Sequence, residues 1–72
     1  MIHRFKISRF LAEIDFPENY DSENTIPIAI ANPGETEFRD GHDWWFTPDS
    51  PDPSEWMQEA LTEVNSWIQS HA

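Results

Sequence analysis

Hydrophobic positions over residues 2–16 fit two different periods. One set lies on a single helical face: Ile7, Phe10, Leu11 and Ile14. Another set alternates along the chain, as in a strand: Phe10, Ala12, Ile14 and Phe16. We favour a strand, with Phe5 and Ile7 on one face and a β-bulge near Ser8 and Arg9 that turns both halves to the same side. A helix is the alternative, and it would remove one strand from the sheet.

A polar stretch at 17–24 predicts a loop before the clearest alternation of the chain. Within 25–31, three isoleucines share one face and alternate with smaller residues, which is typical of a strand. These isoleucines are Ile26, Ile28 and Ile30. Because Pro27 has no backbone N–H to donate, the strand is expected at an edge of the sheet, or Pro27 close to its start.

The next segment predicts a turn followed by a hairpin. Asn32-Pro33-Gly34 combines a proline, which fixes φ, with a glycine that tolerates positive φ. Residues 36–39 and 44–47 then resemble the two arms of a hairpin that closes around residues 40–43. In that arrangement Glu35, Glu37 and Arg39 would share one strand face.

Apolar residues recur at helical spacing near the end of the chain. Before them, three prolines between Thr47 and Pro53 predict a stiff connection. Asp52 is a suitable N-cap, Pro53 suits the first helical position, and Glu55 would complete a capping box. The apolar arc of the helix comprises Trp56, Met57, Ala60, Leu61, Val64, Trp67 and Ile68.

Together these elements predict a small α+β domain spanning residues 1–72. Its antiparallel sheet of three to four strands would be covered on one face by the C-terminal amphipathic helix, leaving a polar, acidic face on the other side. The chain has no cysteine, so neither disulfides nor a thiolate metal site can support it. Ten aromatic residues supply much of the area that so short a chain must bury.

The charge is strongly acidic, with 14 Asp and Glu against four Lys and Arg, a formal net charge of −10. Three of the four basic residues lie within the first nine positions. This balance argues against direct binding to DNA, RNA or anionic lipid, because each requires a basic surface. The N-terminal stretch does not resemble a signal peptide, and no apolar run is long enough to span a membrane, so we expect a cytoplasmic location.

No catalytic or cofactor motif is present, and we expect neither an enzyme nor a cofactor. Asp40, His42 and Asp43 have the chemistry of a metal or acid–base site, but the further ligands that Zn²⁺ or Ca²⁺ requires do not follow. An ordinary hairpin turn explains them better, and we predict no metal site. No serine lies in a nucleophile motif such as G-x-S-x-G.

The carboxylates form two groups that are candidates for contact with a partner. Glu55, Glu59 and Glu63 lie at successive i, i+4 positions on the predicted helix, where no lysine or arginine pairs with them. Dipole compensation near the helix start is the simpler explanation for the first two. The second group, around the predicted hairpin, comprises Glu35, Glu37, Asp40 and Asp43. It would join Asp49, Asp52 and Glu55 in one continuous negative surface, although a solvated hairpin face is again the simpler explanation.

Trp45 is the aromatic candidate, since it would point away from the helix if Trp44 and Phe46 face it. It would then be either an exposed interaction hot spot or packed under residues 48–53, and we lean to the packed arrangement. The complete set of predicted partner-binding residues is Glu35, Glu37, Asp40, Asp43, Trp45, Asp49, Asp52, Glu55, Glu59 and Glu63.

These features predict a binding protein that docks onto a basic surface of a larger protein. One such partner is a protein whose basic surface normally holds nucleic acid. Its carboxylates would take the place of phosphates, as in a DNA mimic, and inhibit the partner stoichiometrically. In size and charge the chain resembles inhibitors that phages and mobile elements make against host defence complexes. The alternative is a structural or adaptor subunit that binds through exposed aromatics. Partner identity and oligomeric state stay open at this point.

Overall fold

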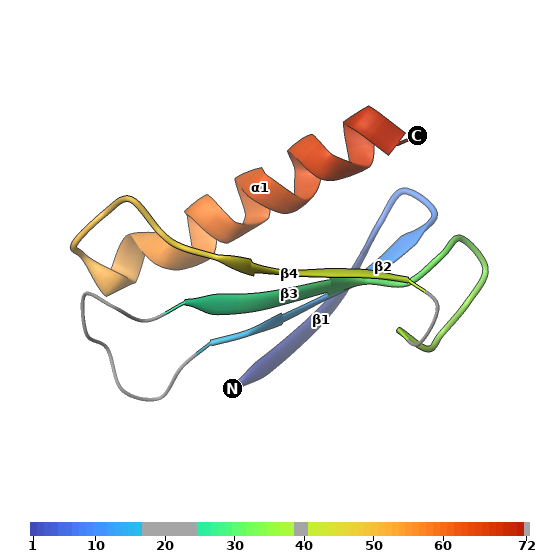
Figure 1. The fold of residues 1–72 in the computed structure, drawn as a ribbon, viewed down its shortest axis with the longest axis horizontal. Helices are drawn as coiled ribbons and strands as arrows, with labels where there is room; N and C mark the ends of the chain where they lie inside the picture. Colours follow the sequence, from blue (N-terminus) through green and yellow to red (C-terminus); the bar gives the residue numbers. More distant parts are fainter. Residues whose placement is uncertain (17–24, 39–40, 72) are drawn as a thin grey trace.

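The computed structural model describes residues 1–16, 25–38 and 41–71. Four strands form one antiparallel sheet in the order β1-β2-β3-β4, and a helix lies across one of its faces (Figure 1). The elements are β1 (Ile2–Ile7), β2 (Phe10–Asp15), β3 (Ile26–Ile30), β4 (His42–Phe46), the short 3-10 helix η1 (Pro53–Glu55) and α1 (Trp56–His71). The predicted α+β fold is therefore confirmed. The predicted loop at 17–24 lies outside the described residues.

Residues 2–16 form two strands rather than the single bulged strand that we predicted. β1 and β2 are joined by a two-residue turn at Ser8 and Arg9, and Ile7 pairs with Phe10 across it. Directly opposed residues of an antiparallel pair point to the same face of the sheet. A chain reversal at Ser8 thus produces the same change in alternation as a bulge, which is why the sequence pattern did not distinguish them.

Ser8 carries the conformational strain of this turn. Its φ is 57°, a left-handed value that glycine adopts more readily than serine. Replacing it, Ser8→Gly, should raise the free energy of unfolding by about 0.5 to 1 kcal/mol, after allowing for the added freedom of the unfolded chain. Urea denaturation measures this. Arg9→Gly is the matched control and should lower stability, because Arg9 has no positive φ to relieve; equal responses at both positions would contradict the assignment.

β3 lies inside the sheet, so the edge position predicted from Pro27 is wrong. The strand is hydrogen-bonded to β2 on one side and β4 on the other. Its register with β2 covers only Ile28 to Ile30, and Pro27 precedes that segment. Pro27, at the second position of the strand, faces Trp45 in the register with β4. The missing N–H is thus tolerated because Pro27 lies close to the start of the strand.

The predicted hairpin between residues 36–39 and 44–47 is also wrong. β4 pairs with β3 instead, with Ile28 opposite Trp44 and Ile30 opposite His42. Thr36 to Phe38 lie in the irregular connection between them, and Arg39 lies outside the described residues. The isoleucine face of β3 provides three apolar partners for β4, whereas Phe38 is the one apolar residue of 36–38 and its two neighbours there are exposed.

Within this connection the predicted turn at Asn32-Pro33-Gly34 is confirmed. The backbone N–H of Glu35 donates to the carbonyl oxygen of Asn32 at 3.0 Å. Gly34 has a φ of +85°, the left-handed conformation that the turn chemistry requires.

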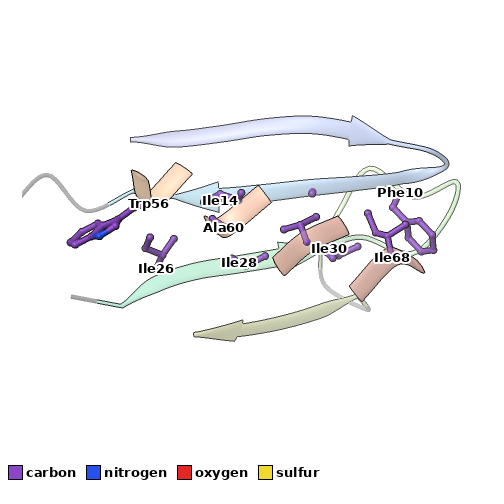
Figure 2. Packing of buried hydrophobic residues seen from close by; sticks show 10 residues of the cluster. Phe10, Ile14, Ile26, Ile28, Ile30, Trp56, Ala60 and Ile68 are labelled. Atoms are coloured by element: carbon purple, nitrogen blue, oxygen red, sulfur yellow. The ribbon is translucent and has the colours of Figure 1, made fainter. Parts of the chain in front are cut away.

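The core lies between α1 and the middle of the sheet (Figure 2). Trp56, Ala60, Val64 and Ile68 form the buried stripe of the helix, as the apolar arc predicted. They pack on the buried sheet residues Phe10, Ala12, Ile14, Ile26, Ile28 and Ile30. Figure 2 shows Trp56 near one end of this cluster and Phe10 with Ile68 at the other. Among the described residues, no helix is both long and apolar enough to cross a membrane.

The predicted helix start is confirmed except for one contact. Asp52 accepts a hydrogen bond from the backbone N–H of Ser54 at 3.0 Å, and Pro53 opens η1. The capping box is not formed in the predicted way, because the backbone N–H of Asp52 donates to Ser50 Oγ at 3.1 Å and not to Glu55.

Candidate functional site

One face of the sheet is left uncovered by the helices and strands of the described part of the chain. Because side chains alternate along a strand, the residues between the buried positions point away from α1. Register across all four strands places them on the surface opposite α1, which we call the open face. Figure 1 shows α1 on the other side of the sheet. The open face comprises Ile2, Arg4, Lys6, Leu11, Glu13, Asp15, Pro27, Ala29, Asp43 and Trp45.

A shallow hollow of about 170 Å³ lies on this face beside β4. Pro27 and Ala29 of β3 lie opposite Trp45 and Asp43 in the register with β4, and their small side chains leave space there. We call this site the acidic hollow; it is lined by Glu13, Asp15, Pro27, Ile28, Ala29, Asp43, Trp44 and Trp45.

Trp45 is 71% exposed, so the prediction that it packs under residues 48–53 is wrong and the exposed alternative holds. Its neighbours Trp44 and Phe46 point to the helix side, as the alternation predicts. Trp44 stacks on Trp67 of α1 with ring centroids 6.1 Å apart. The contact between Trp44 and Trp67 holds β4 against α1, and the indole of Trp45 faces solvent on the other side of the same strand.

The three carboxylates of the acidic hollow differ in how far they are neutralised. Arg4 Nε donates to Glu13 Oε2 at 2.8 Å, and the amino group of Met1 lies 3.6 Å from Asp15 Oδ1. No cation of the described residues lies within ion-pair distance of Asp43. Asp43 and Trp45 are two positions apart on one strand face, about 7 Å. An uncompensated carboxylate therefore stands next to an exposed aromatic ring.

The other predicted partner-binding residues are not gathered into one surface. Glu35 and Glu37 are exposed in the connection that leaves β3 at Ile30, whereas Asp49, Asp52 and Glu55 follow the opposite end of β4. Figure 1 shows these two connections at opposite ends of the sheet. Asp40 lies outside the described residues. The fold therefore does not join Glu35 and Glu37 with the acidic residues after β4 in a single negative surface.

The three helix glutamates differ in role. Glu59 Oε1 accepts hydrogen bonds from the backbone N–H groups of Asp49 at 2.9 Å and Ser50 at 3.3 Å. Glu55 is exposed at the end of η1, and Glu63 is partly exposed. Glu59 therefore holds the loop that follows β4 against α1 through these two hydrogen bonds.

A second, more open hollow of about 340 Å³ lies between this helix face and the end of β4. It is lined by Phe46, Asp49, Gln58, Glu59, Thr62, Glu63 and Ser66.

Replacing Glu59 should test this fastening role. Glu59→Ala removes the acceptor for two backbone N–H groups and should cost about 1 to 2 kcal/mol of unfolding free energy. Glu63→Ala, four residues further along α1, removes the same charge without these bonds and should change stability by less than about 0.5 kcal/mol. Thermal and urea unfolding of both variants measure the difference. A loss at Glu63 as large as that at Glu59 would contradict the assignment.

The structure separates His42 from Asp43 in the predicted Asp40, His42, Asp43 group. His42 points to the helix side, with its ring centroid 4.9 Å from that of Trp67, while Asp43 points to the open face. His71 stacks on Trp67 at 3.9 Å, so these rings form an aromatic cluster. Across the described residues, three or more metal-ligating side chains do not come together.

Two residues of the acidic hollow, Glu13 and Asp15, were absent from the sequence prediction. They alternate with the buried residues of β2, which was the signal available. Their place in the same hollow as Trp45 depends on the strand order, and local patterns do not reveal that order.

In comparison with known proteins, the chain matches no family model, no curated protein and no solved structure.

Proposed function

We propose that this chain is a small acidic protein-binding module that inhibits a larger protein stoichiometrically by occupying its basic surface. The observation that carries the proposal is the imbalance of charge: ion pairs engage only Glu13 and Asp15 among the ten acidic side chains of the described part. The other eight have no cation of the described residues within 4.0 Å. Such a surface attracts a positively charged partner over long range.

In this proposal the carboxylates act as substitutes for phosphates. A partner groove that binds nucleic acid presents arginines and lysines, and a compact acidic protein competes for them. Association is then fast and sensitive to salt, because the attraction is electrostatic. The same properties would suit a cytoplasmic DNA mimic, including a phage-encoded protein that acts against host defence.

The exposed indole of Trp45 favours a second candidate function. A large aromatic side chain that is 71% exposed is a suitable centre for a protein interface. In an adaptor or structural subunit this ring would supply the contact, and the acidic residues would keep the chain soluble. The two candidates differ in salt dependence, because apolar contacts respond weakly to ionic strength.

Capture of partners at two salt concentrations tests the proposal. The immobilised chain is incubated with host-cell lysate at about 0.1 M and about 1 M NaCl, where the Debye length is about 10 Å and about 3 Å. We expect basic, nucleic-acid-binding proteins to be retained only at the lower concentration. Nucleic acid should then displace the chain from the purified partner. Retention that is equal at both concentrations, with no competition by nucleic acid, would overturn the proposal and favour the adaptor.

A further inference from the structure

We infer that the acidic hollow receives an arginine side chain of the partner, with the guanidinium group stacked on Trp45 and hydrogen-bonded to Asp43. This inference rests on the proposed function and names the part of the partner that the open face recognises. The contact with the partner then lies at a defined place on the sheet and not on the scattered carboxylates of the loops.

The shape of the hollow favours a flat, extended side chain. Pro27 and Ala29 lie opposite Trp45 and Asp43, and the large indole of Trp45, which has a flat aromatic face, lines the hollow beside these smaller residues. A guanidinium group is planar and stacks on such a face through cation–π attraction. A lysine ammonium group is a compact, strongly hydrated charge that uses the face less fully.

The charges of the hollow specify a cation. Covering Asp43 with a neutral partner would remove water from a carboxylate that has no described counter-charge, and that is unfavourable. An arginine supplies paired N–H donors to the carboxylate and keeps it compensated. Glu13 is held by Arg4 at 2.8 Å, so it is less available than Asp43 as the acceptor.

Two other occupants fit the surface less well. A second copy of this chain would bring another net charge of −10 against the same charge here, and the two cations on the open face, Arg4 and Lys6, do not offset it. A purely apolar partner surface would contact Trp45 but would leave Asp43 desolvated. Charge complementarity therefore favours a basic protein segment.

A peptide titration followed by NMR tests the inference without the natural partner. The probe is the blocked peptide acetyl-Gly-Arg-Gly-amide, and the matched probes carry citrulline or lysine in place of arginine. We expect saturable shifts of the Trp45 indole N–H and of the Ala29 and Asp43 amides, with a dissociation constant on the order of 1 mM. The neutral citrulline peptide should bind at least about tenfold more weakly, and the lysine peptide should lie between them.

Two variants locate the binding site. Trp45→Ala and Asp43→Asn should each weaken arginine-peptide binding at least about fivefold. Gln69→Ala, at an exposed position of α1, should leave it unchanged. Each variant is first checked by its amide spectrum; because Trp45 is exposed, its removal is not expected to disturb the core. The conservative variant Trp45→Phe keeps an aromatic face and should retain most of the binding.

The inference is overturned if arginine and citrulline peptides bind equally, if the shifts spread over all acidic residues, or if Trp45→Ala binds as the wild type does. These outcomes are distinguishable from a failure of the proposed function. A chain that binds a basic partner in a salt-sensitive way, yet fails the peptide test, retains the function and loses this site. A chain that passes the peptide test but captures no basic protein loses the proposed function alone.

Discussion

Ile28→Ala should lower the free energy of unfolding by about 3 kcal/mol and the melting temperature by roughly 12 to 24 °C. Ile28 is 1% exposed, lies in the middle of β3, and packs in the cluster that α1 covers. The lost methyl and methylene contacts and the remaining cavity both contribute to the cost. For a chain of this length, total stability is on the order of 4 to 11 kcal/mol, so one truncation removes a large fraction.

The matched control makes the same change at an exposed site. Ile2 lies on the edge strand β1 and is 56% exposed, so Ile2→Ala should cost less than about 1 kcal/mol. Urea denaturation with circular dichroism measures both variants. A small loss at Ile28, or equal losses at the two positions, would show that β3 is not the centre of the core.

Gly41→Ala should destabilise the fold by about 2 to 3 kcal/mol, although the glycine lies in a connection and not in the core. A Cβ atom at this position would overlap the carbonyl oxygen of Ile30 and lie 3.0 Å from Cα of Ala31. Both contacts are with backbone, so rotation of a side chain cannot relieve them. Gly41 thus allows the chain to return close to the end of β3 before β4 begins.

Gly34 provides the control because it needs a special φ but has open space around it. No heavy atom lies within 4 Å of a Cβ placed there, and its φ is +85°. Asparagine tolerates this conformation, so Gly34→Asn should cost less than about 1 kcal/mol. Gly41→Asn should remain as damaging as Gly41→Ala. Differential scanning calorimetry of these variants checks the contrast, and a tolerated Gly41 variant would refute the predicted backbone clash.

The sequence predicts α1 well because its signals are local. The spacing of Trp56, Ala60, Val64 and Ile68, with a cap at Asp52, identifies the buried face before any partner is known. Strand pairing is not local, and here prediction failed. The segment 36–39 was expected to pair with β4, whereas β3 provides the apolar partner from further back in the chain.

The candidate site shows the same division. The outward direction of Trp45 follows from the alternation with Trp44 and Phe46, so sequence alone was sufficient for it. The hollow required the strand order, since Glu13 and Asp43 are brought to one face by β3 between them. The role of Glu59 depended on the path of the loop after β4, which no spacing rule describes.

The most direct measurement of the unneutralised acidic surface is the melting temperature at pH 7 as NaCl rises from about 0.01 M to about 1 M. Over this range the Debye length falls from about 30 Å to about 3 Å, so repulsion among exposed carboxylates is screened. The eight described acidic residues without ion pairs outweigh the two that have them, and the melting temperature should therefore rise. A flat or falling melting temperature would mean that the carboxylates are neutralised within the chain, and it would contradict an acidic surface that attracts a basic partner.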